Sequence, residues 1–215
     1  MNWSTKFNLP IVFFLCFIFS TLSTSFTLAK EKSESLSSYL ALFEQPNIFR
    51  AKYKKVKYLP SLSRGLSSEG DFIYIKERGL IWLMKTPFKM TTVIKGNKLN
   101  LWVEGEKQPQ QKKYQNMIKP VLQNISAIFT GDFKYLKKDF VLHKKFLENR
   151  KWEIILIPTS AYIKPYLQKI IINGMQYIES VNIVYTNDKY TIVTYEKPLI
   201  GSSYITKEER EIFDK

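Results

Sequence analysis

The sequence is poor in the residues that carry most catalytic and metal chemistry, with one cysteine, Cys16, and one histidine, His143. Zinc sites need clustered His and Cys ligands, and a nucleophilic site needs a base beside its nucleophile, so neither site is indicated. The 8 glycines form no phosphate-cradling loop. Carboxylate pairs such as Glu69 with Asp71 could act as glycosidase acid and base, but a chain with 19 acidic residues always offers such pairs. The sequence therefore predicts a protein without catalysis, metal or cofactor.

Long hydrophobic runs are missing as well, and this decides how the N-terminus is interpreted. The segment Ile11–Phe19 has no polar side chain, but a bilayer span needs roughly 20 apolar residues. Lys6 precedes this segment and small residues follow it as far as Ala29, which is the layout of a secretory signal peptide. We expect cleavage after Ala29, so that residues 1–29 are a leader and residues 30–215 form one secreted domain. A retained membrane anchor is the less favoured alternative.

Acidic residues are too few to balance the basic ones. The chain has 33 Lys and Arg against 19 Asp and Glu, a formal net charge of +14. A strong positive charge favours nucleic acid, an anionic membrane surface or acidic partners. For a secreted protein we expect no nucleic acid and a transient contact with a membrane surface. A Lys-rich solvated surface without any partner explains the charge equally well.

What the sequence does contain is a series of short strands separated by turn residues, which predicts a single curved antiparallel sheet. Helical periodicity appears in residues 35–44, in 118–129 with Gly131 as the stop, and behind the capping-box pattern Thr206–Glu209. A phase shift between Tyr53 and Val56 predicts a bulge. The expected strands are 48–58, 70–76, 80–85, 89–95, 98–103, 139–146, 152–157, 168–172, 176–185 and 190–195. The predicted fold class is α+β, with an antiparallel sheet and two or three helices.

Two of these strands are apolar on both faces, which a half-exposed antiparallel strand is not. They are Leu80–Met84 and, apart from one Glu, Trp152–Ile157. Such strands need cover on both sides of the sheet. Ordinary core packing explains this pattern, and so does an apolar cavity between the sheet and its helices. The residues alone do not separate a filled core from an open one.

Several motifs resemble the LolA-like family of periplasmic lipoprotein carriers. In the front half, the residues from Tyr58 to Trp82 and then Lys85-Thr-Pro-Phe88 are similar to that family's strand, hairpin, tryptophan and following proline. In the back half, Trp152–Pro158 is similar to its W-x-L-x-L-x-P strand, and Ile170–Val193 to its final hairpin. The resemblance extends over about residues 36–195.

The resemblance implies an unclosed β-barrel whose apolar cavity is lidded by helices and shields acyl chains in the periplasm. It further implies a monomer that takes a lipoprotein or other lipid cargo from an inner-membrane release complex and passes it to an outer-membrane acceptor. The expected wall residues are Tyr74, Trp82, Trp102, Trp152 and Tyr185, and the expected lid residues are Leu122, Ile125 and Phe129.

Known carriers of this family have an arginine in the strand before the tryptophan that helps to hold the lid. The candidates here are Arg78, which falls in a turn, and Lys76. This departure is more typical of a divergent branch, whose cargo can differ. The alternative function is an envelope regulatory or interaction module of the same fold that binds a protein partner.

Overall fold

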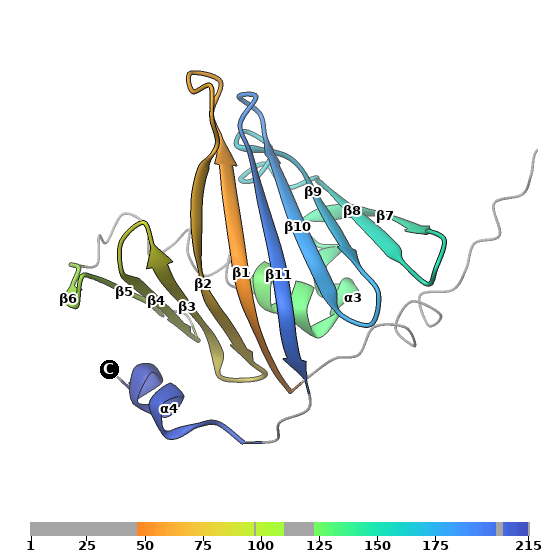
Figure 1. The fold of residues 1–215 in the computed structure, drawn as a ribbon. Coiled ribbons are helices and arrows are strands. Elements are labelled where there is room, and N and C mark those ends of the chain that lie inside the picture. The colour runs from red at the N-terminus through yellow and green to blue at the C-terminus, as the bar shows by residue number, and fades with distance from the viewer. Residues whose placement is uncertain (1–46, 97, 110–122, 201–203, 215) are drawn as a thin grey trace, which may run out of the picture. The chain divides into compact units, whose positions relative to one another are not determined.

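Antiparallel strands joined mostly by tight turns dominate the computed structural model, which describes residues 47–96, 98–109, 123–200 and 204–214. Within these residues they form one 11-stranded sheet with the order β6-β5-β4-β3-β2-β1-β11-β10-β9-β8-β7 (Figure 1). The strands are β1 (Ile48–Tyr58), β2 (Leu66–Ile75), β3 (Gly79–Thr86), β4 (Met90–Lys95), β5 (Lys98–Val103), β6 (Glu106–Lys107), β7 (Phe140–Phe146), β8 (Trp152–Pro158), β9 (Leu167–Gly174), β10 (Ile178–Tyr185) and β11 (Tyr190–Ile200).

The sheet does not close on itself, because β6 and β7 lie at its two ends and do not pair. Strands far apart in the sequence meet at its centre, where β1 pairs with both β2 and β11. The predicted fold class, an α+β protein with a single unclosed antiparallel sheet and a few helices, is confirmed.

Alternation along the strands divides the side chains between two faces. The inner face carries Phe49 and Tyr53 of β1, with Tyr74 of β2 and Tyr195 of β11 opposite them in register, and its core continues across the sheet to Trp152 of β8. The outer face carries a second, smaller cluster that includes Ile81 and Val93. Leu80–Met84 supplies both faces in turn, so the predicted cover on both sides is confirmed for this strand. The same prediction is wrong for Trp152–Ile157, because Ile157 on the outer face is 41% exposed.

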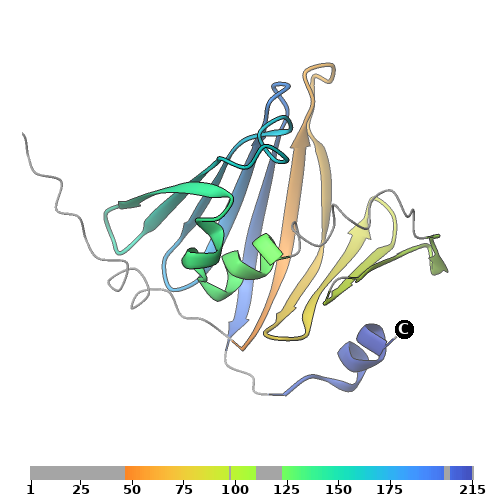
Figure 2. The same cartoon turned by 180° about the vertical axis from the view of Figure 1, so that it is seen from behind.

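Short helices cover both faces. Residues 123–130 are helical and lie over the inner face together with α3 (Phe133–Leu136), as Figure 2 shows from behind. Gly131, with a φ of 64°, ends the first helix as predicted. On the outer face lies α4 (Lys207–Asp214), whose Phe213 belongs to the outer cluster.

The capping box that opens α4 is present as predicted. The backbone N–H of Thr206 donates to Glu209 Oε2 at 2.9 Å, and the Glu209 N–H donates to Thr206 Oγ1 at 3.2 Å. These two reciprocal bonds satisfy donors that a helix start leaves unpaired. The helix boundary could therefore be read from four residues of sequence.

The bulge predicted between Tyr53 and Val56 is absent, and some elements were not predicted. The register of β1 with β2 is continuous through Tyr53 and Val56, and the irregularity against β11 lies between Arg50 and Lys52. The apparent phase shift arises because lysines occupy the inner-face positions there. Residues 161–166 form consecutive turns before β9, and the sequence did not predict α3 and β6.

Other expectations lie outside the described residues, namely the leader 1–29, the helix 35–44 and the first part of the helix that begins near 118. Within the described residues, no helix is both long and apolar enough to cross a membrane.

Candidate ligand-binding face

The inner face has an aromatic floor at the centre of the sheet. Phe72 lies in its middle with no solvent exposure. Its ring centroid is 6.1 Å from that of Phe49, 5.2 Å from that of Trp82 and 5.2 Å from that of Tyr195. The register explains this grouping, because Trp82 lies directly opposite Phe72. Four neighbouring strands, β3, β2, β1 and β11, therefore build one continuous aromatic surface.

The helix over this floor contributes one ring to it. Phe129, 5 % exposed, stacks on Phe72 with centroids 4.8 Å apart and on Tyr74 at 5.4 Å. It also approaches Phe49 at 5.6 Å and Tyr195 at 5.9 Å. Residues 123–130 contain no charged side chain. Dispersion and burial therefore dominate the contact between this helix and the floor, and these forces have little directional preference.

The inner face continues onto β8 and β9, where Trp152 is its largest side chain. The Trp152 indole N–H donates to the Met175 carbonyl at 2.6 Å, and the ring lies over Gly174. A Cβ on Gly174 would come within 2.5 Å of the ring, so this strand position requires glycine. Two residues of α3, Phe133 and Leu136, are buried in the same core.

Polar atoms are embedded in the floor, where the Tyr53 hydroxyl is near the Trp82 indole N–H and the Tyr74 hydroxyl is near Ser126. Among the described residues they include the hydroxyls of Tyr53, Tyr74 and Ser68 and the indole Nε1 of Trp82. Burial raises the pKa of Tyr53 to about 12, and the nearby indole N–H of Trp82 opposes this shift only in part. Buried polar groups in native proteins normally have partners. The Tyr53 hydroxyl and the Trp82 indole N–H can donate hydrogen bonds to oxygen atoms of a bound molecule.

The chemistry of the inner face changes along β1. Phe49, Ala51 and Tyr53 are buried, but the next two positions on the same face are Lys55 and Lys57. Burial lowers the pKa of Lys55, and the positive charge of Lys57 lowers it further. The apolar part of the inner face therefore ends on β1 at Lys55 and Lys57, which are positively charged.

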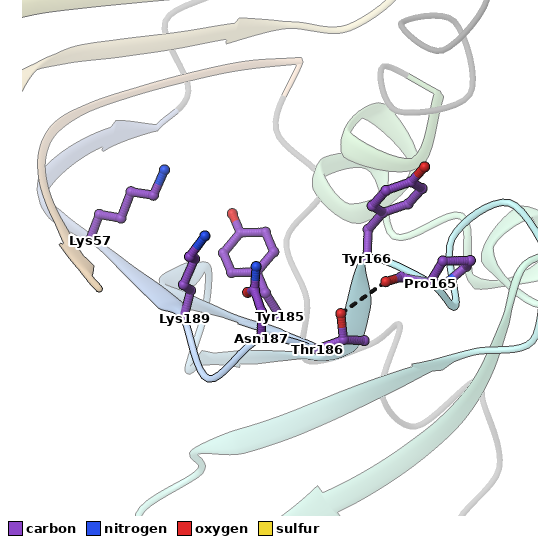
Figure 3. A pocket seen from close by; sticks show the side chains of 7 residues that line it. All are labelled: Lys57, Pro165, Tyr166, Tyr185, Thr186, Asn187 and Lys189. Carbon is purple, nitrogen blue, oxygen red and sulfur yellow. Dashed lines mark hydrogen bonds between the residues drawn. The ribbon is translucent and has the colours of Figure 1, made fainter. Parts of the chain in front are cut away.

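A pocket of about 330 Å³ lies at this end of the inner face (Figure 3). Thr186 joins two of its walls, since its hydroxyl donates to the Pro165 carbonyl at 2.9 Å and its N–H to the Tyr166 carbonyl at 3.3 Å. The pocket is lined by Lys57, Pro165, Tyr166, Tyr185, Thr186, Asn187 and Lys189.

An ion pair attaches α4 to the outer face of the sheet. Arg50 forms a two-point ion pair with Glu209 of α4, in which Nη2 donates to Oε2 at 2.7 Å and Nε donates to Oε1. Arg50 Nη2 also donates to the Tyr204 carbonyl at 3.0 Å. Burial raises the pKa of Glu209, but the hydrogen bonds from Arg50 and Thr206 outweigh this, so that the pKa is lowered overall.

The structure brings together most of the predicted site residues, but not all. Tyr74, Trp82 and Trp152 share the inner core, with Ile125 and Phe129 over it. Tyr185 lies at the rim, in the lysine-bearing pocket. Leu122 is outside the described residues.

Two predicted residues lie elsewhere. Trp102 packs in the outer cluster with Phe213, on the opposite face of the sheet from Trp82. Arg78 is exposed in the β2–β3 turn. The hydrogen bond from Lys95 is the main cause that lowers the pKa of Asp214 in α4, and the charge of Arg78 adds a smaller effect. Lys76, the other candidate for holding the lid, is exposed as well.

Sequence reasoning missed the Arg50–Glu209 pair and the two-lysine pocket. The capping box identified Glu209, but its arginine partner lies 159 residues earlier and pairs with it only through the fold. Lys57 and Lys189 come together because β1 and β11 are neighbours. A signal existed for Lys57, since it follows Lys55 at strand spacing after three buried positions of the same face.

Comparison with known proteins gives matches among solved structures only. No protein-family model matches the sequence. No curated protein sequence matches it. The chain is similar to LolA superfamily proteins. A member of that superfamily from Nitrosomonas europaea has 10% sequence identity and a TM-score of 0.48, with 85% of this chain and 99% of that chain covered.

Two further structures have similar scores. A candidate outer membrane lipoprotein-sorting protein domain from Vibrio parahaemolyticus has 6% identity and a TM-score of 0.42, covering 84% of this chain and 97% of that chain. A DUF1329 family protein from Desulfovibrio piger has 7% identity and a TM-score of 0.43, covering 81% of this chain and 94% of that chain. The first of these structures belongs to the superfamily that the sequence motifs resemble.

Proposed function

We propose that this protein is a non-catalytic carrier that binds the acyl chains of a lipoprotein or other lipid on the inner face of its sheet. The observation that supports this most is the Phe129 ring, which lies on four aromatic side chains of the floor. The described helical residues that carry it, 123–130, have no charged side chain. An acyl chain can replace such a ring, because apolar contacts depend on area and hardly on direction. Each buried CH₂ of the ligand contributes about 0.8 kcal/mol.

The proposed cycle follows from this exchange. The helix of residues 123–130 moves off the floor as the acyl chain enters, and returns when the cargo leaves. We further propose that the mature chain, residues 30–215, acts in the periplasm. It takes up its cargo at an inner-membrane release complex and delivers it to an outer-membrane acceptor. The LolA superfamily similarity and the lipoprotein-sorting neighbour are consistent with it.

The two tryptophans on opposite faces provide a matched test. The wild-type chain, Trp82→Gln and Trp102→Gln are purified from a bacterial envelope, and their bound molecules are measured by native mass spectrometry and organic extraction. We expect the wild-type chain and Trp102→Gln to retain lipid or acylated peptide, and Trp82→Gln to lose it. Thermal unfolding of each variant checks that the fold is retained.

Two outcomes would contradict the proposal. One is a wild-type chain that is purified without lipid and stays so when lipids are offered, above all if it forms a stable complex with a protein. That result would favour the interaction module. The other is equal lipid loss from both variants, which would separate lipid binding from the inner face.

A further inference from the structure

The inner face of this protein offers two chemically different surfaces in one continuous path. Phe49, Ala51 and Tyr53 give an apolar and aromatic stretch along β1, and Lys55 and Lys57 follow at the same two-residue spacing. On the neighbouring strand β11, Val193 is in register with Lys55 and Thr191 with Lys57, and both of these β11 residues are buried. A ligand that matched this path would have an apolar tail and a polar, negatively charged end.

The pocket at the basic end is built from three separate segments. Lys57 belongs to β1, Lys189 to the turn between β10 and β11, and Tyr166 to the turns before β9. The amino groups of Lys57 and Lys189 point in the same direction in Figure 3. Both charged side chains that line the pocket are lysines. Two like charges that line one cavity favour the binding of an anion near them.

The lysines of the outer face differ in their partners. Lys54 pairs with Glu69 at 3.6 Å, Lys85 with Asp71 at 2.5 Å and Lys95 with Asp214 at 3.0 Å. Within the described residues, the inner-face lysines Lys55, Lys57 and Lys189 form no ion pair with a carboxylate. The carboxylate partners of Lys54, Lys85 and Lys95 thus lie on the outer face, while the charges of Lys57 and Lys189 at the pocket are left for a ligand.

We propose that the pocket between Lys57 and Lys189 binds the phosphate or carboxylate head group of an amphiphile whose apolar chain lies on the inner face. This inference rests on the proposed function and narrows its ligand to an anionic amphiphile. Charge-assisted hydrogen bonds from two ammonium groups recognise either oxyanion. The Tyr53 hydroxyl and the Trp82 indole N–H lie close together on the inner face, and both can donate hydrogen bonds to oxygen atoms near the head group.

The test compares ligands that share a ten-carbon chain and differ in the head group. The delipidated mature chain is titrated with decyl phosphate, decanoate and 1-decanol below their aggregation limits, with inorganic phosphate as the head group alone. Tryptophan fluorescence reports binding. We expect decyl phosphate and decanoate to bind about tenfold more tightly than 1-decanol, since a charged hydrogen bond contributes an effect of that order, and inorganic phosphate to bind weakly.

Two matched double variants test whether the preference for anionic ligands depends on the lysines of the pocket. Lys57→Gln with Lys189→Gln removes two charges from the pocket, and Lys52→Gln with Lys54→Gln removes two charges from the other face of β1. We expect the first pair to abolish the preference for anionic ligands while 1-decanol binds as in the wild-type chain. The second pair should preserve the preference. Thermal unfolding checks that both double variants fold.

The outcomes separate this inference from the proposed function. Equal binding of all three ten-carbon ligands to the wild-type chain would overturn the head-group site and leave the apolar face intact. Equal loss of the preference in both double variants would reduce it to general surface charge and also overturn the site. Inorganic phosphate that binds as tightly as decyl phosphate would show an anion site unconnected to the apolar face. No binding of any ten-carbon ligand would overturn the proposed function itself.

Discussion

The helix on the inner face and the helix on the outer face are held against the same sheet by different kinds of interaction. Residues 123–130 are uncharged and contact the floor largely through apolar side chains such as Phe129. In α4, by contrast, Glu209 forms a two-point ion pair with Arg50, and the capping box fixes the first turn. An acyl chain can take the place of an apolar ring, but it cannot replace a carboxylate.

This difference suggests a division of roles between the two faces. The ion pair is directional and largely buried, with 15% and 8% of the two side chains exposed. Breaking such a pair leaves a charge without compensation, which makes the attachment of α4 hard to reverse. The inner helix has a replaceable attachment. We therefore assign the structural role to α4 and the exchangeable role to residues 123–130.

The largest expected effect comes from removing one aromatic ring from each cover. Phe129→Ala should lower the free energy of unfolding by about 3–5 kcal/mol, as is typical of a buried Phe. Phe213→Ala should cost about 2 kcal/mol, near the transfer free energy of one buried side chain, because Phe213 packs in the smaller outer cluster. Urea unfolding of both variants measures these values.

The effect of a ligand on the melting temperature gives a second comparison of the same two variants. Saturating 1-decanol should raise the melting temperature of Phe129→Ala more than that of Phe213→Ala, since the space left by Phe129 is where the chain binds. Equal shifts in the two variants would mean that the ligand does not use this space.

A smaller effect is expected from Glu209→Gln, which keeps the capping box because Gln can replace Glu in that motif. Loss of the charged partner of Arg50 should cost about 1–3 kcal/mol. Hydrogen exchange should become faster in 207–214 and stay unchanged in 123–130. Faster exchange in both helices would contradict the independence of the two covers.

Acid should reproduce part of this effect in the wild-type chain. The pKa of Glu209 is lowered from its usual 4.5 in the folded state. Its contribution to stability is therefore complete above pH 4.5 and is lost as the pH falls through the lower, folded value. Hydrogen exchange in 207–214 should accelerate in that range, and Glu209→Gln should show no such acceleration. A pH response of the same size in Glu209→Gln would assign it to other groups.

The smallest effect is expected from Lys54→Gln on the outer face. Lys54 and Glu69 are 3.6 Å apart, and more than half of each side chain is exposed. An exposed ion pair of this kind contributes less than about 0.5 kcal/mol. Urea unfolding that showed a loss as large as that of Glu209→Gln would mean that burial does not distinguish the two pairs.

The fold was more predictable than the site, for a physical reason. Local pattern decides strands and caps, so alternation gave β1, and Thr206 with Glu209 gave the start of α4. The side of the sheet on which a side chain lies depends on register and on which strands meet. Trp102 was for this reason expected beside Trp82, although the pairing of β3, β4 and β5 places them on opposite faces. Arg50 could not be matched with Glu209 before the fold was known.

The most direct test of the central claim is hydrogen–deuterium exchange of the wild-type chain with and without saturating 1-decanol, a neutral ligand that is independent of the lysine pocket. The account predicts faster exchange in residues 123–130 when the ligand is bound, because the helix leaves the floor, with unchanged exchange in α4. Exchange in 123–130 that is the same with and without bound ligand, or a change confined to α4, would contradict it.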